Sequence, residues 1–401
     1  MADVLTQLLE STKKQFQKKF KSSETEFIFA KDEKPVTGLI VDNPLMEYIL
    51  DRRFLAYGRF YLTYGKKGSC KTSLFFDLAK TFQRNNGGVI WLETERAADL
   101  DYAKKQGVDT DRMILQHPHN LEEALNLAEM YIRNLPKTDP DGKTPILICL
   151  DSIAGTTTEY EQDSANDMTS TVPGTHARLL SRFYREMEHP LANERCIFLA
   201  LNQLKEKIGG MGGFGEEAPE SMMGGEAPRF SSTYQWKMSY TGALKGKNAQ
   251  GVERKYGSKH QIVCKRNKLG REGNMQNIDF DMYINGGIDW YTPLVRKLAK
   301  DEYKDLVSGE GNSITWKVEG CRYTDDEGNE QTIPTDDTLS QRNLAIMIAK
   351  SSDAKEAIRK GFEIPDLPSD SEVAEVEKER LTKRGKKAKK LGSEEEQQTA
   401  P

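Results

Sequence analysis

The stretch Gly65-Lys66-Lys67-Gly68-Ser69-Cys70-Lys71-Thr72 follows the apolar run 60–64 and precedes a helical pattern over 73–79. It fits the motif G-x-x-x-x-G-K-[ST] except at Cys70, where the motif has its second glycine. In that motif, backbone N–H groups surround phosphate oxygens at a helix N-terminus, the lysine reaches the β and γ oxygens, and the hydroxyl holds Mg²⁺. A non-glycine residue keeps the N–H but adds a side chain and a cost for any positive φ. The stretch therefore predicts a phosphate-binding loop; a Gly/Lys-rich turn without function is the alternative.

The segments around this loop alternate between apolar strand patterns and amphipathic helix patterns. Strands are predicted at 89–92, 146–150 and 196–201, and helices at 97–106 and 175–187. Buried apolar strands separated by helices are typical of a doubly wound, mainly parallel sheet. The sequence thus predicts an α/β fold for the main part of the chain.

Composition divides the chain into four predicted regions. They are an N-terminal helix with a polymerisation arm (1–34), the core (35–290), a small C-terminal α+β domain (291–365) and a disordered charged tail (366–401). In the arm, the apolar run 26–30 is either a strand that adds to the next copy of the chain or an ordinary edge strand. The tail prediction rests on low complexity and on charge, including the basic run 383–390.

The overall composition excludes several classes of protein. A net charge of −4 over 401 residues neither favours nor excludes nucleic acid as a partner. The sequence contains no run of the roughly 20 apolar residues that a membrane span needs, and no signal-peptide block, which predicts a cytoplasmic protein without a membrane partner. Five separated cysteines predict reduced thiols, and the pair His117 and His119 predicts a loop rather than a metal site.

Two acidic positions are predicted to complete a site for nucleotide hydrolysis. Asp151 ends the apolar run 146–150 and is expected to hold Mg²⁺ together with Thr72. Glu93 and Glu95 follow the run 89–92, and one of them is expected to orient the attacking water. An exposed turn at a helix N-terminus, which favours negative charge, is the alternative for both glutamates.

The segment Leu92–Asp109 resembles the bacterial RecA recombinases, whose matching stretch carries the catalytic glutamate and then an Asp and a Tyr that hold the adenine. Four further segments extend the resemblance through nearly the whole core: 150–154, 174–185, 201–209 and 265–268. The resemblance implies a RecA-type P-loop ATPase core, with Glu95 as the catalytic residue and Asp99 and Tyr102 at the base. The altered phosphate loop and the tail resemble the phage UvsX-like branch, which implies the cytoplasm of a host cell.

The same resemblance implies how the site is completed. ATP lies between neighbouring subunits of a helical filament, and Arg266 and Lys268 match two cations that reach the neighbour's phosphates. Gln203 matches a sensor of the γ-phosphate. The implied nucleotide-binding residues are Gly65, Lys66, Lys67, Gly68, Ser69, Cys70, Lys71, Thr72, Asp99, Tyr102 and Asp151. From spacing alone, two alternatives remain. Arg266 and Lys268 could belong to a solvated strand end, and Gln203 could be an amide without a role.

Two long polar segments are predicted to bind DNA. The segment 205–225 combines glycines with lysines and large apolar side chains, as single-strand binders do. The segment 158–173 is acidic, so its contacts are expected from Gly174 and the arginines of the following helix. The predicted contact residues are Gly174, Arg178, Arg185, Lys205, Lys207, Ile208, Gly209, Gly210, Met211, Phe214, Gly224 and Gly225. The basic, loop-like stretch 245–260 is either a second site for duplex DNA or a solvated hairpin.

Together, these features predict a DNA-dependent ATPase that uses ATP and Mg²⁺ and forms homo-oligomeric helical filaments on single-stranded DNA. It would pair that strand with homologous duplex DNA in recombination, repair and replication. A recombination mediator and a single-strand-binding protein are the further partners that this role implies. Two alternatives remain: a hexameric helicase motor on the same core, and a DNA-binding scaffold in which Cys70 has abolished hydrolysis.

Overall fold

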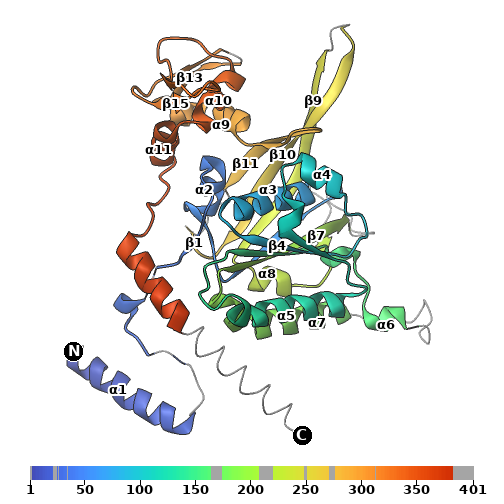
Figure 1. Ribbon diagram of the computed structural model, residues 1–401, viewed down its shortest axis with the longest axis vertical. Helices are drawn as coiled ribbons and strands as arrows, with labels where there is room; N and C mark the ends of the chain where they lie inside the picture. The colour runs from blue at the N-terminus through green and yellow to red at the C-terminus, as the bar shows by residue number, and fades with distance from the viewer. Residues whose placement is uncertain are drawn as a thin grey trace, which may run out of the picture.

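The structure is a computed structural model (Figure 1). It describes residues 2–20, 25, 27–33, 35–163, 174–206, 220–247, 251–270, 276–311 and 313–382. A large twisted sheet forms the centre, helices cover both of its faces, and a smaller unit lies at one end (Figure 1). This arrangement confirms the predicted α/β fold with a small C-terminal unit.

The central sheet has the strand order β5-β4-β6-β7-β3-β9-β10-β11-β12. Its strands are β3 (Arg59–Gly65), β4 (Gly88–Glu93), β5 (Met113–Gln116), β6 (Ile146–Asp151), β7 (Cys196–Glu206), β9 (Tyr234–Lys247), β10 (Glu253–Asn267), β11 (Asn277–Tyr283) and β12 (Gly287–Asp289). Neighbours from β5 to β9 run parallel, and those from β9 to β12 run antiparallel. A short strand, β8 (Glu220–Met222), pairs antiparallel with the end of β7.

Alternating side chains of the parallel strands build one apolar core on each face of the sheet. Tyr61 of β3 belongs to the core that contains Phe75 of the first crossover helix. Its neighbour Phe60 belongs to the other core, where its ring lies edge-on to Tyr184 and Phe198. Each such aromatic pair contributes about 0.5–1.5 kcal/mol beyond its buried area.

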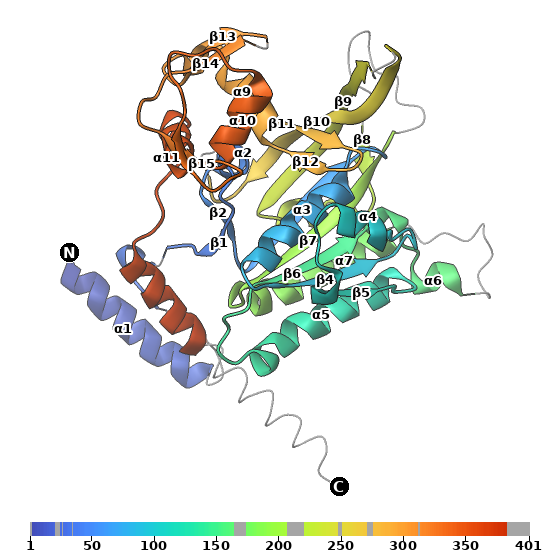
Figure 2. The same cartoon turned by 45° about the horizontal axis from the view of Figure 1, so that its top comes forward.

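The helices of the main region lie between or beside these strands. They are α2 (Pro44–Leu50), α3 (Lys71–Arg84), α4 (Leu100–Lys105), α5 (Leu121–Thr138), α6 (Glu159–Gln162), α7 (Thr175–Ala192) and α8 (Ala227–Ser231). Helix α3 covers one face of the sheet, and α5 and α7 cover the other (Figures 1 and 2). The helix predicted over 97–106 is shorter, because the Asp99 side chain caps α4 by accepting from the backbone N–H of Tyr102.

The strand order brings the predicted site residues to one edge of the sheet. Strand β7 lies between β3, which leads into the phosphate loop, and β6, which ends in Asp151. Strand β4, which ends in Glu93, pairs with β6 on its other side. The carboxyl ends of parallel strands are where open α/β sheets bind their ligands.

The C-terminal unit consists of two hairpins and three helices. These are β13 (Val307–Glu310) with β14 (Ser313–Trp316), β15 (Arg322–Thr324) with β16 (Glu330–Thr332), and the helices α9 (Tyr291–Leu298), α10 (Gln341–Ala349) and α11 (Ser352–Gly361). Short strands β1 (Gly38–Ile40) and β2 (Phe54–Ala56) flank α2 in the main region. The division of the chain at residues 290 and 365 stays a prediction.

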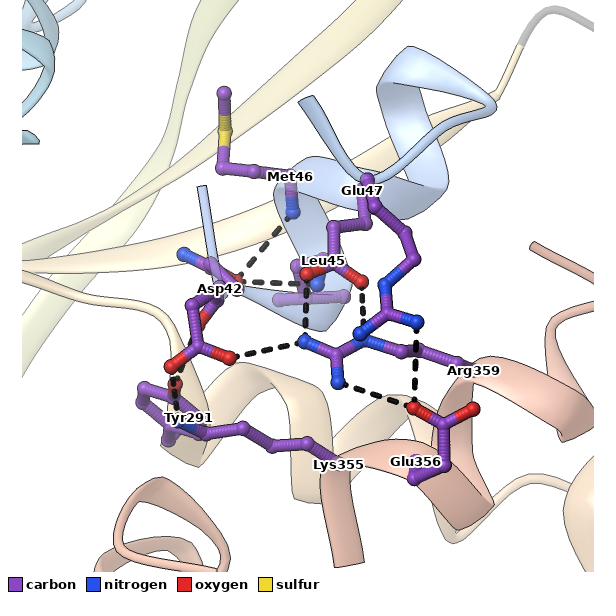
Figure 3. Close-up of polar contacts among 10 residues, drawn as sticks. Asp42, Leu45, Met46, Glu47, Tyr291, Lys355, Glu356 and Arg359 are labelled. Atoms are coloured by element: carbon purple, nitrogen blue, oxygen red, sulfur yellow. Dashed lines mark hydrogen bonds and ion pairs between the residues drawn. The ribbon is translucent and has the colours of Figure 1, made fainter. Parts of the chain in front are cut away.

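Four charged side chains, here called the α11 latch, join this unit to the segment before and within α2 (Figure 3). They are Asp42, Glu47, Lys355 and Arg359. Arg359 donates to both carboxylate oxygens of the fully buried Glu47, at 2.6 and 2.8 Å, and to Asp42 at 2.9 Å. Lys355 donates to the second oxygen of Asp42 at 2.7 Å. The bidentate geometry fixes the orientation of α11 against α2.

Both ends of the chain differ from expectation. Residues 2–19 form the predicted helix α1, but Phe27–Phe29 pair with no strand among the described residues. In the tail, residues 370–382 form a helix where charge predicts disorder. Contacts with the core explain it: Glu377 pairs with Arg195 at 3.1 Å, and Arg380, which is buried, donates to the carbonyl of Gly142.

Candidate nucleotide-binding site

The loop 65–72 joins β3 to the N-terminus of α3, which is the arrangement that the motif requires. The Lys71 ammonium donates to the carbonyls of Gly65 and Lys66, both at 3.1 Å, and lies 3.5 Å from the Ser69 hydroxyl. Lys71 and Thr72 begin α3, whose positive dipole end faces the loop. The loop therefore presents a cation and a helix N-terminus to the same space.

Backbone geometry explains two of the glycines in the loop. A Cβ atom on Gly65 would lie 2.3 Å from the carbonyl oxygen of Met238, so only glycine fits between β3 and β9. Gly68 has φ of +78°, where other residues are strained. Cys70 also has a left-handed conformation, with φ of +65°. The left-handed conformation at this position explains why the motif has a glycine there. Cys70 adopts that conformation although it carries a side chain.

Thr72 and Asp151 form the predicted pair for a divalent cation. The Thr72 hydroxyl donates to a carboxylate oxygen of Asp151 at 2.9 Å. Burial and the neighbouring Glu95 and Glu93 raise the pKa of Asp151 to about 6, against the opposing effects of the Thr72 hydrogen bond and Lys71. An excess of negative charge in a buried place favours a cation. The residues present therefore fit Mg²⁺, with Thr72 and Asp151 as the groups that would hold it.

The Lys71 ammonium is the complementary part of this site. Burial lowers the pKa of Lys71, while Asp151 and Glu95 act in the opposite direction. A partly desolvated ammonium gains more from an anion than a solvated one does. Lys71 therefore fits the role of binding phosphate oxygens.

Glu95 lies beside the ends of β6 and β7. One of its carboxylate oxygens accepts from the Ser152 hydroxyl at 2.6 Å and from the Gln203 amide at 2.7 Å. A Cβ atom on Gly155 would lie 2.6 Å from Cγ of Glu95, so a larger residue at this position would displace the Glu95 side chain. The structure thus brings Glu95 and Gln203 together and holds the carboxylate from two directions.

Glu93 has a different environment, although it is only two residues away. It is buried, and its carboxylate accepts from the backbone N–H groups of Glu95 and Ala97 at 2.9 and 3.2 Å. Its other oxygen lies 2.9 Å from Nδ1 of His117. Glu93 therefore stabilises the turn that presents Glu95, whose own carboxylate is exposed.

The two predicted adenine contacts lie at the start of α4. Asp99 is the exposed N-cap residue of that helix. The Tyr102 ring packs edge-on against Phe76 of α3, and its hydroxyl lies 3.5 Å from that of Ser73. Tyr102 is therefore close to the first turn of α3. The contact of Asp99 and Tyr102 with an adenine base stays a prediction.

Arg266 and Lys268 lie away from the phosphate loop of their own chain. Arg266 pairs with Gln235 near the start of β9, whereas the phosphate loop follows the register pair of Gly65 with Met238. Lys268 donates to the carbonyl of Phe230 at 2.7 Å, and Arg266 to that of Arg229 at 3.3 Å. The structure does not bring either cation together with Lys71.

The described end of the second predicted DNA-binding segment lies against the N-terminal half of α7. Cβ atoms on Gly224 and Gly225 would lie 2.4 Å from Leu180 and 2.8 Å from Ala177, both in α7. Gly174 is the N-cap residue of that helix. The remaining predicted contacts of the second segment, namely Lys207, Ile208, Gly209, Gly210, Met211, Phe214 and the side chain of Lys205, lie outside the described residues.

The arginines of α7 are spread along the helix. Arg178 and Arg185 are both exposed, and Arg185 donates to the carbonyl of Ser181. Eleven residues separate Arg185 from Gly174, which corresponds to about 16 Å along a helix. Arg178 therefore lies in the first turn of α7, and Arg185 does not.

The basic stretch 245–260 is a hairpin rather than a loop. Its described residues form the ends of β9 and β10, and Lys245 pairs with Glu253 at 3.1 Å. His260 is buried, and burial together with Lys255 lowers its pKa to about 4, so it adds no positive charge to the surface. Its Nε2 atom lies 3.2 Å from Sγ of Cys70.

Ser152 and Gly155 had no role assigned from the sequence, and His260 was considered only as part of the basic stretch 245–260. Ser152 directly follows Asp151, and this adjacency to a strand-end acid was the available signal. Gly155 and His260 offered none, because they act through contacts with Glu95 and Cys70 that are distant in sequence.

A phosphate loop between a strand and a helix, with Thr72 bound to the acid at the end of a second strand, defines the class of P-loop nucleotide-binding proteins. Residues 7–289 match the family model for the RecA N-terminal domain. The chain belongs to the RecA family.

Several curated relatives support this membership. The chain is 30% identical to the protein RecA of Bartonella bacilliformis over 234 residues, which cover 58% of this chain and 61% of that protein. It is 26% identical to a protein RecA of Clostridium botulinum over 313 residues, which cover 75% of this chain and 80% of the relative. The match to the Bartonella protein thus spans less than two thirds of that relative's length. Among the described residues, the structure has no helix with the length and apolar character of a membrane span.

Proposed function

We propose that this chain is a DNA-dependent ATPase that forms ATP-gated helical filaments on single-stranded DNA and catalyses homologous pairing and strand exchange. The observation that carries the proposal is the contact of the Gln203 amide with Glu95 at 2.7 Å. Gln203 lies in β7, and β7 leads directly into the predicted DNA-binding segment 205–225. A side chain that touches the candidate base therefore lies next to the candidate DNA contact.

In this mechanism, Lys71 binds the phosphates, and Thr72 and Asp151 hold Mg²⁺, which supplies charge neutralisation at the phosphate oxygens. The Glu95 carboxylate accepts a proton from the attacking water. Ser152 and Gln203 orient that carboxylate by donating to one of its oxygens. Asp99 and Tyr102 bind the adenine, and Gln203 senses the γ-phosphate.

Assembly supplies the remaining cations. Arg266 and Lys268 are separated from Lys71 of the same chain, which supports a role at the site of the adjacent subunit. Cations delivered from a neighbour stabilise charge on the transferred phosphoryl group and make hydrolysis depend on assembly. Phe27–Ala30 would join the neighbour, since Phe27–Phe29 belong to no strand among the described residues of their own chain. Cys70 together with the tail supports the phage UvsX-like branch.

The test is DNA-stimulated ATP hydrolysis by the full chain and three variants. We expect Lys71→Ala to lose nucleotide binding and Glu95→Gln to keep ATP and DNA binding while turnover falls about 10²–10⁴-fold. Glu93→Gln is the matched control, because its amide oxygen still accepts from the N–H groups of Glu95 and Ala97, and its turnover should stay within a few-fold of wild type.

Electron microscopy with ATP and single-stranded DNA tests the assembly. Open filaments are expected; closed rings would instead indicate a helicase motor, and a protein that stays monomeric would refute the proposal. Normal turnover by Glu95→Gln would show that another residue is the base. DNA binding without any turnover in the wild type would favour the scaffold alternative.

A further inference from the structure

The side chain of Cys70 points away from the phosphate loop toward a strand of the antiparallel half of the sheet. Its Sγ atom lies 3.2 Å from Nε2 of His260 in β10, within hydrogen-bonding distance for sulfur. The same Nε2 atom lies 2.8 Å from the Ser258 hydroxyl. The residue that departs from the glycine of the motif thus has a specific partner 190 residues away in sequence.

His260 is held rigidly in this position. It is 1% exposed, its ring stacks on Phe280 with centroids 5.1 Å apart, and Tyr240 contacts its edge at 5.7 Å. The register of β9 and β10 shifts between Lys259 and His260, an irregularity that re-aims side chains. Its Nδ1 atom is buried and has no hydrogen-bond partner among the residues that the structure describes. The ring is therefore placed by packing, and its polar contacts lie on the side of Cys70.

The chemistry of the contact is that of a neutral thiol and a neutral imidazole. Burial raises the pKa of Cys70 to about 11, with a Ser73 hydrogen bond and the cations Lys71 and Lys255 acting in the opposite direction. Burial and Lys255 lower the pKa of His260 to about 4. With the ring proton on Nδ1, the Nε2 lone pair accepts from the Cys70 thiol and the Ser258 hydroxyl, which share it; with the proton on Nε2, the ring donates toward them.

Cys70 needs such support because of its backbone. A left-handed conformation is unfavourable for a residue with a Cβ atom, and Cys70 has φ of +65°. A hydrogen bond stabilises a folded structure by a free energy of similar size. The interaction with His260 thus offsets the conformational cost of the left-handed backbone at Cys70, a cost that a glycine at this position would not have.

We propose that His260 is a positioning residue for nucleotide binding: through the Cys70 thiol it holds the last bend of the phosphate loop in the shape that glycine adopts in the motif. This role rests on the nucleotide-binding function proposed above. It also makes the β9–β10 hairpin a supporting element of the nucleotide site. His260 itself has no contact with phosphate in this role.

The test compares His260→Ala in two backgrounds, the natural chain and Cys70→Gly. In the natural background we expect the dissociation constant for Mg·ATP, measured by calorimetry, to rise about five- to tenfold, as the loss of one hydrogen bond predicts. In the Cys70→Gly background, His260→Ala should change the dissociation constant for Mg·ATP less than twofold. A glycine at position 70 adopts the left-handed conformation without a supporting hydrogen bond. The KM for ATP should follow this pattern while kcat at saturating ATP stays unchanged.

Two further variants separate positioning from folding. His260→Gln should restore most of the affinity, because the glutamine amide oxygen reaches the place of Nε2 and accepts from the thiol. Tyr240→Ala is the matched control, because it removes packing against His260 but leaves Cys70 unchanged. Its affinity for Mg·ATP should equal that of the wild-type chain. If His260→Ala fails to fold, His260→Phe takes its place in both backgrounds, because it keeps a ring against Phe280 and Tyr240 but offers no polar atom to Cys70.

An equal loss of affinity in both backgrounds, or no loss in either, overturns the role of His260. A lack of ATP binding by the wild-type chain would instead overturn the proposed function. The two failures are distinguishable because the wild-type chain is measured first, without any substitution.

Discussion

The nucleotide site and the α11 latch both gather charged side chains, most of them buried, but they balance the charge differently. In the latch, two carboxylates meet two cations, and Arg359 alone makes three of the contacts. In the site, Asp151 lies near two further carboxylates, Glu93 and Glu95, and near one ammonium, that of Lys71. The latch is complete within the chain, whereas the site has an excess of negative charge.

The pKa values of the two regions follow this difference. Burial raises the pKa of Asp42, but Lys355 and Arg359 outweigh it and hold the pKa below its usual value. Burial raises that of Asp151 to about 6, and the nearby glutamates add to the effect. A balanced cluster stabilises the fold, and an unbalanced one stores free energy that a bound cation releases. Three substitutions sharpen this contrast.

The largest effect is expected at the latch. Arg359→Ala leaves the carboxylate of Glu47 buried without its cation, which costs about 3–5 kcal/mol of unfolding free energy. The free energy is measured by urea denaturation at pH 7. The double variant Glu47→Leu with Arg359→Met is the control, because apolar replacement of a whole buried pair is often neutral. A single variant as stable as wild type would show that the latch does not hold the C-terminal unit.

A smaller effect of opposite sign is expected at the site. Because the pKa of Asp151 is about 6 in the fold and 3.8 in the unfolded chain, the folded state binds the proton more tightly. The stability of the chain without Mg²⁺ therefore falls as pH rises from about 4 to about 6, and it stays lower above that range. Asp151→Asn removes this loss and should stabilise the metal-free chain by up to about 3 kcal/mol at pH 8.

Denaturation in EDTA between pH 4.5 and 8 measures this slope. Asp42→Asn is the comparison at the latch: Asp42 has a lowered pKa, so its contribution is present above its unfolded pKa and is lost as pH falls through the folded value. That substitution should destabilise the chain at pH 8. If Asp151→Asn were also destabilising there, the charge excess at the site would be refuted.

The smallest effect is expected next to the site, at Gly155. A methyl group there lies 2.6 Å from Cγ of Glu95 and must displace the carboxylate. A shift of about 1 Å in a catalytic group costs up to about 100-fold in rate. We expect kcat for ATP to fall 10- to 100-fold in Gly155→Ala, while the dissociation constant for ATP and the thermal midpoint stay unchanged.

Gly242→Ala is the matched control for this measurement, because a Cβ atom at that position meets nothing within 4 Å. Its kcat should equal that of wild type. Full activity in Gly155→Ala would mean that the position of Glu95 does not limit turnover.

The roles of residues that belong to a local sequence motif were predictable from the sequence. The roles of residues that act through contacts distant in sequence were not. The strand that ends in Asp151 and the loop that ends in Thr72 each have a local signature, so their contact at 2.9 Å was expected. Spacing could not choose between Glu93 and Glu95, since both follow one strand. The turn between them and α4, which includes Arg96 at φ of +54°, determines which carboxylate is buried.

The helix at 370–382 and the pair of Cys70 with His260 mark the limit of sequence patterns. Composition alone predicts disorder in the first case, because it counts charges without their partners Arg195 and Gly142. In the second case the partner lies 190 residues away and depends on a register shift in the sheet. Neither can be found by periodicity.

Strand β7 borders both the strand of the phosphate loop and the strand of Asp151, and Gln203 lies near its end. In the proposed mechanism, the presence or loss of the γ-phosphate would change the position of the Gln203 amide. That change would reach the backbone of the next residue over only a few ångströms. No hinge between domains has to bend. In the proposed function, this arrangement would couple the nucleotide site to the predicted DNA-binding segment 205–225 without moving the rest of the sheet.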